Sequence, residues 1–172
     1  MTRLSRRTFL KLTGSSAALG TLSLAPITQA QQNSPSTAGN THLPYPHEVI
    51  ARLSELTVNQ PFYFTYPDIH SPCVVIRRDR EVKGGVGPDK DIVAFSTQCT
   101  HMGCPVSYDQ EAETFKCPCH YSIFDPDNIG QMVIGQATEN LPRIILEYDE
   151  AEDALRAVSI DGLIYGRQAN II

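Results

Sequence analysis

The most informative part of the sequence is CTHMGCPVSYDQEAETFKCPCHYSIFD, residues 99–125. It holds four of the chain's five cysteines and two of its five histidines. They form two short groups, Cys99-Thr100-His101-Met102-Gly103-Cys104 and Cys117-Pro118-Cys119-His120, with twelve residues between them. Each group offers one cysteine and one histidine as metal ligands and one further cysteine. The pattern predicts a metal centre held between two loops.

Three kinds of site use these residue types. In [2Fe–2S] centres of the Rieske type two histidines replace two cysteines on one iron, so Cys99 and Cys117 would bind one iron and His101 and His120 the other. A structural Cys₂His₂ zinc site usually presents C-x₂₋₄-C and H-x₃₋₅-H pairs, whereas this chain interleaves C-x-H with C-x-C-H. A framework of disulfides alone would give the two histidines no task. The spacing therefore favours the iron–sulfur centre.

CTHMGC followed by CPCH resembles the Rieske iron–sulfur family, in the branch with a disulfide across the two loops. The resemblance covers residues from about 45 to 172. It implies an all-β, mainly antiparallel fold of stacked sheets, with a cluster-binding subdomain at about residues 96–142. It also implies one [2Fe–2S] cluster per chain and the following site residues: the metal ligands Cys99, His101, Cys117 and His120, and a disulfide between Cys104 and Cys119.

Within that branch, residues 120–142 (HYSIFDPDNIGQMVIGQATENLP) are similar to the small subunit of arsenite oxidase. Rieske proteins of bc complexes typically read CPCHGS and later carry a GPAP-like proline loop. This chain has Tyr121 for that glycine and Gly135-Gln136-Ala137-Thr138 in the loop's place.

The resemblance implies an electron-transfer subunit of an oxidoreductase, with no substrate chemistry by this chain alone. A large molybdopterin subunit carrying a [3Fe–4S] cluster would oxidise arsenite to arsenate, and the electrons would pass through this chain to a periplasmic cytochrome c or azurin. The alternative is the Rieske subunit of a bc-type quinol:cytochrome c oxidoreductase.

Two residues after the second group are expected to tune the reduction potential. In high-potential Rieske proteins a serine and a tyrosine donate hydrogen bonds to the sulfurs, which favours the reduced form. Ser122 matches the serine, but Phe124 occupies the tyrosine's place and has no hydroxyl. The sequence therefore predicts a lower potential than that of a typical bc-complex Rieske protein.

The N-terminal segment matches an export signal. Ser5-Arg6-Arg7-Thr8-Phe9-Leu10-Lys11 fits the twin-arginine pattern, and a weakly apolar stretch follows up to Thr28-Gln29-Ala30, a cleavage-type site. We expect a signal peptide at residues 1–30, a polar linker at 31–46, a Rieske domain at 47–172, and export in the folded state to the periplasm. Retention of the segment as an uncleaved membrane anchor stays open.

Charge leaves two interpretations open. The signal holds four basic residues (Arg3, Arg6, Arg7 and Lys11) and no acidic one, so the rest of the chain keeps 10 basic and 19 acidic residues, a formal charge of −9. An acidic surface could steer a basic redox partner, or it could serve only to keep the domain soluble. Nothing in the sequence indicates nucleic-acid binding.

Short runs rich in β-branched and aromatic residues predict strands at residues 62–66, 74–77, 92–95, 144–148, 155–160 and 163–165. Residues 47–53 form the one pattern that favours a helix. Cys73, outside the motif, is expected to be a buried thiol at the start of a strand. The remaining histidines, His42, His47 and His70, are expected on the surface.

Overall fold

The computed structural model describes residues 44–171. The expected export signal, and residues 31–43 of the expected linker, lie outside the described residues. The strands of the described part are β1 (Glu48–Arg52), β2 (Pro61–Thr65), β3 (Pro72–Arg77), β4 (Ile92–Ser96), β5 (Ser107–Asp109), β6 (Thr114–Lys116), β7 (Ile123–Asp125), β8 (Gln131–Ile134), β9 (Arg143–Asp149) and β10 (Ala154–Asp161). Two 3₁₀ helices, η1 (Leu53–Glu55) and η2 (Pro126–Asn128), complete the elements.

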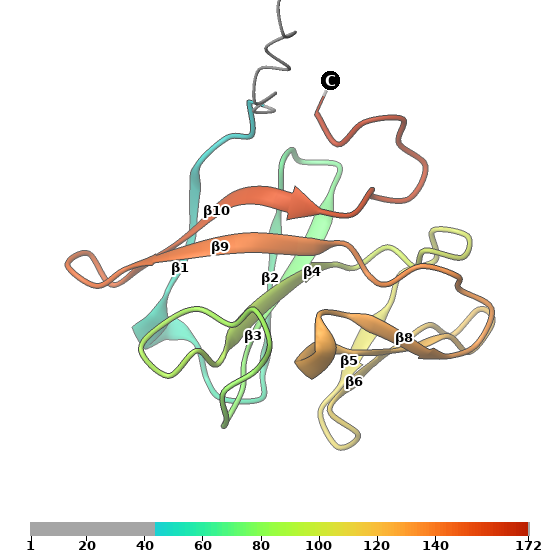
Figure 1. Ribbon diagram of the computed structural model, residues 1–172, viewed down its shortest axis with the longest axis horizontal. Helices are drawn as coiled ribbons and strands as arrows, with labels where there is room; N and C mark the ends of the chain where they lie inside the picture. The colour runs from blue at the N-terminus through green and yellow to red at the C-terminus, as the bar shows by residue number, and fades with distance from the viewer. Residues whose placement is uncertain (1–43, 172) are drawn as a thin grey trace, which may run out of the picture. The chain divides into compact units, whose positions relative to one another are not determined.

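The strands form two antiparallel sheets (Figure 1). The larger has the order β1-β10-β9-β4-β3-β2 and the smaller β5-β6-β7-β8. The chain therefore leaves the large sheet after β4, builds the whole small sheet, and returns at β9. This insertion holds both metal-binding loops and falls within residues 96–142. The prediction of an all-β, mainly antiparallel fold is confirmed.

Strands β3 and β4 contribute to two separate cores. Residues alternate between the faces of a strand, so Cys73 and Val75 of β3 pack into one core and Val74 and Ile76 into the other. The first core includes residues of β9 and β10, whereas the second includes the aromatic side chains of the small sheet. In the second core Phe95 packs edge-on against Phe115, with ring centroids 5.5 Å apart. The metal-bearing half of the molecule therefore rests on one face of β3 and β4.

A buried arginine also connects the two sheets. Arg78, directly after β3, has a side chain that is 1% exposed. Its Nε donates to Asp127 at 2.8 Å and its Nη2 to Glu113 at 2.8 Å. It also contacts the hydroxyl of Tyr108 in β5. Because Asp127, Glu113 and Tyr108 all belong to the inserted part, Arg78 holds that part against the large sheet.

Two local predictions are wrong. Residues 47–53 do not form a helix: Glu48–Arg52 pair with β10 as strand β1 and continue into η1. Five to seven residues make a helix only marginally stable, whereas pairing with β10 satisfies their backbone groups. Residues 163–165 are not a strand, because β10 ends at Asp161, Gly162 has φ +97°, and the chain turns at Ile164. Ile164 is nevertheless fully buried.

Among residues 44–171, no helix is both long enough and apolar enough to cross a membrane.

Candidate metal centre

The two loops have the same hydrogen-bond framework. In the first loop the N–H of Cys99 donates to the carbonyl of Cys104, and the N–H of Gly103 donates to the carbonyl of Cys99, at 2.9 and 2.8 Å. In the second, Cys117 donates to Ser122 at 2.8 Å and Tyr121 donates to Cys117 at 3.1 Å. The bonds join positions with the same separations in sequence. The duplication seen in the sequence is therefore a duplication of backbone structure.

The two predicted sulfur ligands lie together inside the second core. Cys99 and Cys117 are free thiols with 1% and 2% of their surface exposed. Burial raises the pKa of the Cys99 thiol, as does the adjacent Cys117 thiol, to which it is hydrogen-bonded. The backbone N–H groups of His101 and Met102 favour the thiolate and act in the opposite direction. These N–H groups are placed to stabilise a sulfur that carries negative charge.

The two predicted nitrogen ligands also come together. The imidazole rings of His101 and His120 have centroids 4.6 Å apart and stand at 87° to each other. The Nδ1 atom of His101 is buried and has no hydrogen-bond partner among residues 44–171. A buried polar atom without a partner is costly, and coordination of a metal would satisfy it. Together with the two free thiols of Cys99 and Cys117, the pair supplies the two sulfur and two nitrogen ligands of such a centre.

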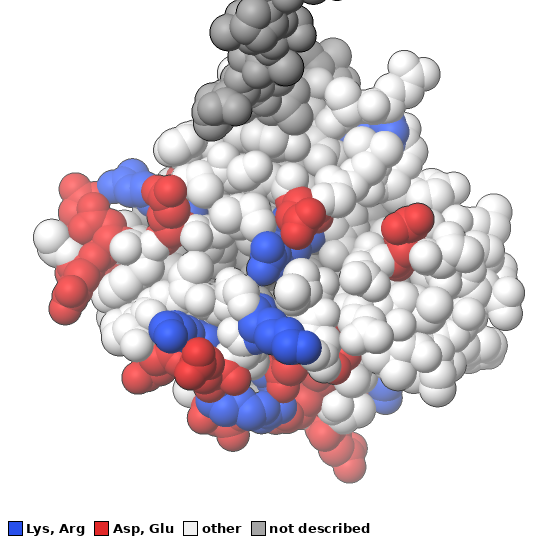
Figure 2. Space-filling model, viewed as in Figure 1, with Lys and Arg blue, Asp and Glu red and all other residues white. Residues whose placement is uncertain are grey.

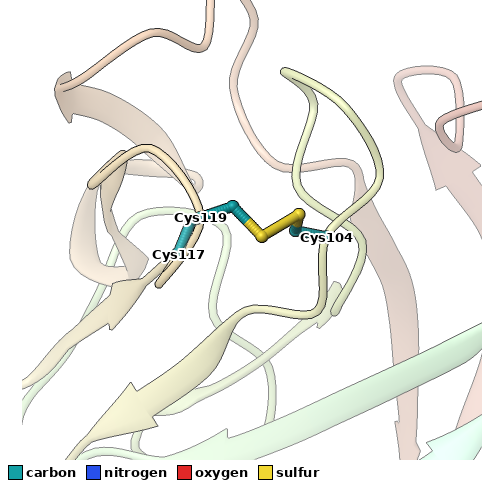
Figure 3. A group of neighbouring side chains, drawn as sticks. All are labelled: Cys104, Cys117 and Cys119. Carbon is teal, nitrogen blue, oxygen red and sulfur yellow. A yellow bond between two sulfur atoms is a disulfide. The ribbon is translucent and has the colours of Figure 1, made fainter.

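A disulfide joins the loops beside these ligands, as the resemblance implied. Cys104 and Cys119 are bonded, with their Cα atoms 6.5 Å apart (Figure 3). The sulfur atoms of Cys104, Cys117 and Cys119 lie within 4.8 Å of one another. The two bonded cysteines cannot act as thiolate ligands, so Cys117 is the one of the three that can bind metal. In the chain-entropy model, closing this loop stabilises the folded state by roughly 3 kcal/mol.

The residues expected to tune the centre are both fully buried. Ser122 Oγ accepts hydrogen bonds from the N–H groups of Gln136 and Ala137, each at 3.1 Å. Because its oxygen already accepts two bonds, the hydroxyl proton remains available as a donor. Phe124 pairs with Phe115 across β6 and β7, and it brings no hydrogen-bonding group to this region.

Residues outside the motif behave as expected where the structure describes them. Cys73 is buried at the second position of β3, and burial raises the pKa of its thiol to about 12. His47 and His70 are exposed, while His42 lies outside the described residues.

Tyr165 is a neighbour of the first loop that sequence patterns did not identify. The ring of Tyr165 covers Gly103 so closely that a Cβ there would lie 2.5 Å from the ring. No pattern in the sequence connects Tyr165 to a loop that lies more than 60 residues earlier.

The comparisons with known proteins agree with this geometry. The Rieske [2Fe-2S] domain model matches residues 48–144. Iodate reductase subunit IdrB of Denitromonas iodatirespirans is 40% identical over 131 residues, 73% of this chain and 69% of the relative. Its counterpart in Pseudomonas sp. (strain SCT) is 38% identical over 168 residues, 95% of this chain and 82% of the relative. The cytochrome bc1 complex Rieske iron-sulfur subunit of Corynebacterium diphtheriae matches only 61 residues, 35% of this chain and 15% of the relative, at 43% identity.

A solved structure has the same fold. The soluble domain of Rieske protein II (soxF) from Sulfolobus acidocaldarius superposes with a TM-score of 0.64 at 23% identity, over 73% of this chain and 83% of that one. From the family match, the extent of the relatives and the shared fold, the chain belongs to the Rieske [2Fe–2S] domain family, and the cofactor of its two loops is a [2Fe–2S] cluster.

Proposed function

We propose that this chain is the electron-transfer subunit of an oxyanion oxidoreductase, in which a larger molybdopterin subunit reduces iodate. The observation that carries the proposal is the similarity to iodate reductase subunits, which extends over 95% of the chain in one relative. The similarity to bc1 subunits is confined to about a third of the chain, so the quinol-oxidising alternative is the weaker one.

Four side chains would hold the cluster: Cys99, Cys117, His101 and His120. When bound, the cluster accepts and releases single electrons. Neutral imidazole ligands make it less negative than four thiolates would, which raises its reduction potential. His120 is exposed and His101 partly buried, so the His120 side gives the shorter route to a partner.

The remaining groups of the site act on this centre without binding it. The disulfide fixes the separation of the two loops, and the second core excludes water from the two thiolates. The Ser122 hydroxyl proton, which no described residue accepts, would be available to a sulfur of the bound cluster. We place the working protein in the periplasm, after export through the twin-arginine route, because the N-terminal pattern and the disulfide both suit that compartment.

Arsenite oxidation is the second candidate, and residues 120–142 favour it through their similarity to the arsenite oxidase small subunit. The two reactions move electrons in opposite directions. Iodate reduction consumes electrons, so they would flow from a donor such as a cytochrome c through this chain to the large subunit. Arsenite oxidation releases electrons, so they would flow from the large subunit through this chain to a cytochrome c or azurin.

The direction of flow gives the test. The chain is purified with the large subunit that accompanies it, and the EPR signal of the reduced centre is followed. Iodate added to the reduced complex should abolish the signal, whereas arsenite added to the oxidised complex should not create it. If arsenite created the signal, the result would overturn iodate reduction and support arsenite oxidation. No response to either anion, together with reduction by a quinol, would overturn both.

A further inference from the structure

Gly103 and Tyr121 occupy equivalent positions in the two loops. Each is the fourth residue after a ligand cysteine, and each donates its N–H to the carbonyl of that cysteine. Both have left-handed backbones, with φ +71° at Gly103 and +59° at Tyr121. The loop geometry therefore demands a positive φ at this position, which glycine adopts freely and a bulky residue adopts only at a cost.

At Gly103 glycine is also required by a contact within the protein. The ring of Tyr165 lies on the glycine, and any side chain would collide with it. The first loop is thus covered by an aromatic side chain from the same molecule.

At Tyr121 the fold gives no reason for the side chain. The residue is 77% exposed, and its hydroxyl makes no hydrogen bond to any residue in 44–171. A tyrosine in the left-handed region is destabilising, because its Cβ comes too close to the following carbonyl oxygen. Neither burial nor hydrogen bonding within the described part of the chain offsets that cost. The second loop therefore keeps an exposed aromatic residue in a left-handed backbone, and residues 44–171 give it neither burial nor a hydrogen bond.

The surroundings of Tyr121 form a surface suited to an uncharged partner. Tyr121 follows the exposed ligand His120, and with Pro118 and Ile123 it lines a cavity of about 250 Å³ whose lining is mostly apolar. The one charged residue of the lining, Lys116, is paired with Asp109 at 2.6 Å. Residues 97–108, 117–124 and 129–138 contain no Asp, Glu, Lys or Arg. In the view of Figure 2, charged residues gather on the left and lower parts of the molecule, and the surface over β8, at the right, carries few.

We propose that Tyr121 is a contact residue for the large subunit, an apolar side chain of which fills the cavity beside it. Permanent interfaces between subunits are more apolar than transient ones, and aromatic residues often supply their binding energy. A mostly apolar surface with a protruding tyrosine, whose one charged lining residue is already paired, fits the permanent partner better than a transient cytochrome. This inference rests on the proposed function, because it names the subunit that receives the side chain.

The test compares wild type with Tyr121→Gly and Tyr121→Asn, both of which accept a positive φ. Each full-length chain is purified with its cluster, and its Kd for the separately purified large subunit is measured. We expect Kd to rise at least tenfold in both variants. Reoxidation of the centre by ferricyanide, which needs no docking surface, should be unchanged, and the urea midpoint of Tyr121→Gly should be no lower than that of wild type.

Tyr63→Thr is the matched control, because Tyr63 is also exposed (59%) but lies in β2 of the large sheet. Its Kd should equal that of wild type. A Kd of the Tyr121 variants within twofold of wild type would overturn the inference, and so would a loss confined to a cytochrome acceptor.

Failure of the proposed function has a different signature. In that case the wild-type complex responds to neither iodate nor arsenite, whatever residue stands at position 121. Because Kd is measured without either anion, it still reports on the contact itself.

Discussion

Ser122 connects the second cluster loop to the segment at residues 135–137. Its carbonyl accepts the N–H of Cys117 and closes the second loop, while its hydroxyl oxygen accepts two N–H groups from residues 136 and 137. Gly135 packs so closely under it that a Cβ would lie 2.3 Å from the Cα of Ser122. The segment that stands in place of the proline loop therefore supports the cluster loop directly.

Replacing this serine should affect both stability and potential. In Ser122→Ala two N–H groups lose their acceptor, which should lower the free energy of unfolding by about 1–3 kcal/mol. Loss of the hydroxyl donor should also lower the reduction potential. Urea unfolding and a redox titration measure the two effects. Ser107→Ala, which changes an exposed serine of the same sheet, should alter neither; an unchanged potential in Ser122→Ala would contradict the assigned role.

A substitution at Phe124 should change the reduction potential in the opposite direction. Phe124→Tyr adds a hydroxyl where other family members place a tyrosine, and we expect the reduction potential to rise because a new donor favours the reduced centre. Phe115→Tyr is the control, since Phe115 is equally buried and pairs with Phe124 in the sheet. A redox titration in which both variants, or neither, shift the potential would show that position 124 has no special relation to the sulfurs.

At the scale of elements, the segment after β10 is held by a salt bridge. Arg167 donates to both carboxylate oxygens of Asp68, at 2.7 and 2.9 Å, and to the hydroxyl of Ser71. The hydrogen bond from Arg167 lowers the pKa of Asp68 to about 2. This segment carries Tyr165, so the salt bridge indirectly supports the cover of the first loop.

The lowered pKa predicts how this support depends on pH. A carboxylate with a depressed folded-state pKa stabilises the fold above its unfolded pKa, near 3.8, and loses that contribution as pH falls toward 2. Wild type should therefore be more stable than Asp68→Asn at neutral pH, and the difference should shrink between about pH 4 and pH 2. Urea unfolding at each pH measures it. A difference that stayed constant from about pH 4 to pH 2 would argue against the salt bridge.

A strand could be predicted from the sequence when its own residues determine its conformation, and not when pairing with a distant segment does. The strands of the large sheet at residues 62–66, 74–77, 92–95, 144–148 and 155–160 were recognisable because each is a long enough run of β-branched and aromatic residues. Residues 47–53 were misjudged because pairing with β10, about 100 residues away, decides their conformation. The strands of the small sheet have three or four residues each, too few to show a period.

The site was predictable to a similar degree. Residue types and spacing pointed to the four candidate ligands, since each loop is a local structure, and the family resemblance implied the disulfide that the structure contains. The contact of Tyr165 with Gly103 and the burial of Arg78 depend on segments that only folding brings together.

At the scale of the whole molecule, Arg78 controls how the two sheets are joined. Its side chain is 1% exposed, and removing it would leave Asp127 and Glu113 without their buried partner. We expect Arg78→Met to lower the free energy of unfolding by about 3 kcal/mol and to broaden the EPR signal. Arg80 bonds to the same two carboxylates but is 45% exposed, so Arg80→Met should cost less than about 1 kcal/mol. Equal losses in the two variants would show that burial of Arg78 is unimportant.

The distribution of charge predicts how electron exchange responds to salt. The acidic residues include a group in the turn between β9 and β10 (Asp149, Glu150, Glu152 and Asp153), whereas the cluster loops are uncharged. Steering by the acidic surface should therefore be weak at the cluster end. Exchange with a soluble cytochrome c should change by less than about twofold while salt shortens the Debye length from ~30 Å to ~3 Å. A steep fall in stopped-flow rates with salt would restore the steering hypothesis.

The two cores that meet at β3 and β4 set a limit on engineering. Because successive residues of these strands face different halves of the molecule, the metal-bearing insert cannot be grafted onto a foreign sheet at its two junctions alone. In a recipient protein, every second residue of two central strands would also have to be replaced so that it packs against the insert. The residues between them would have to keep their packing against the recipient's own core.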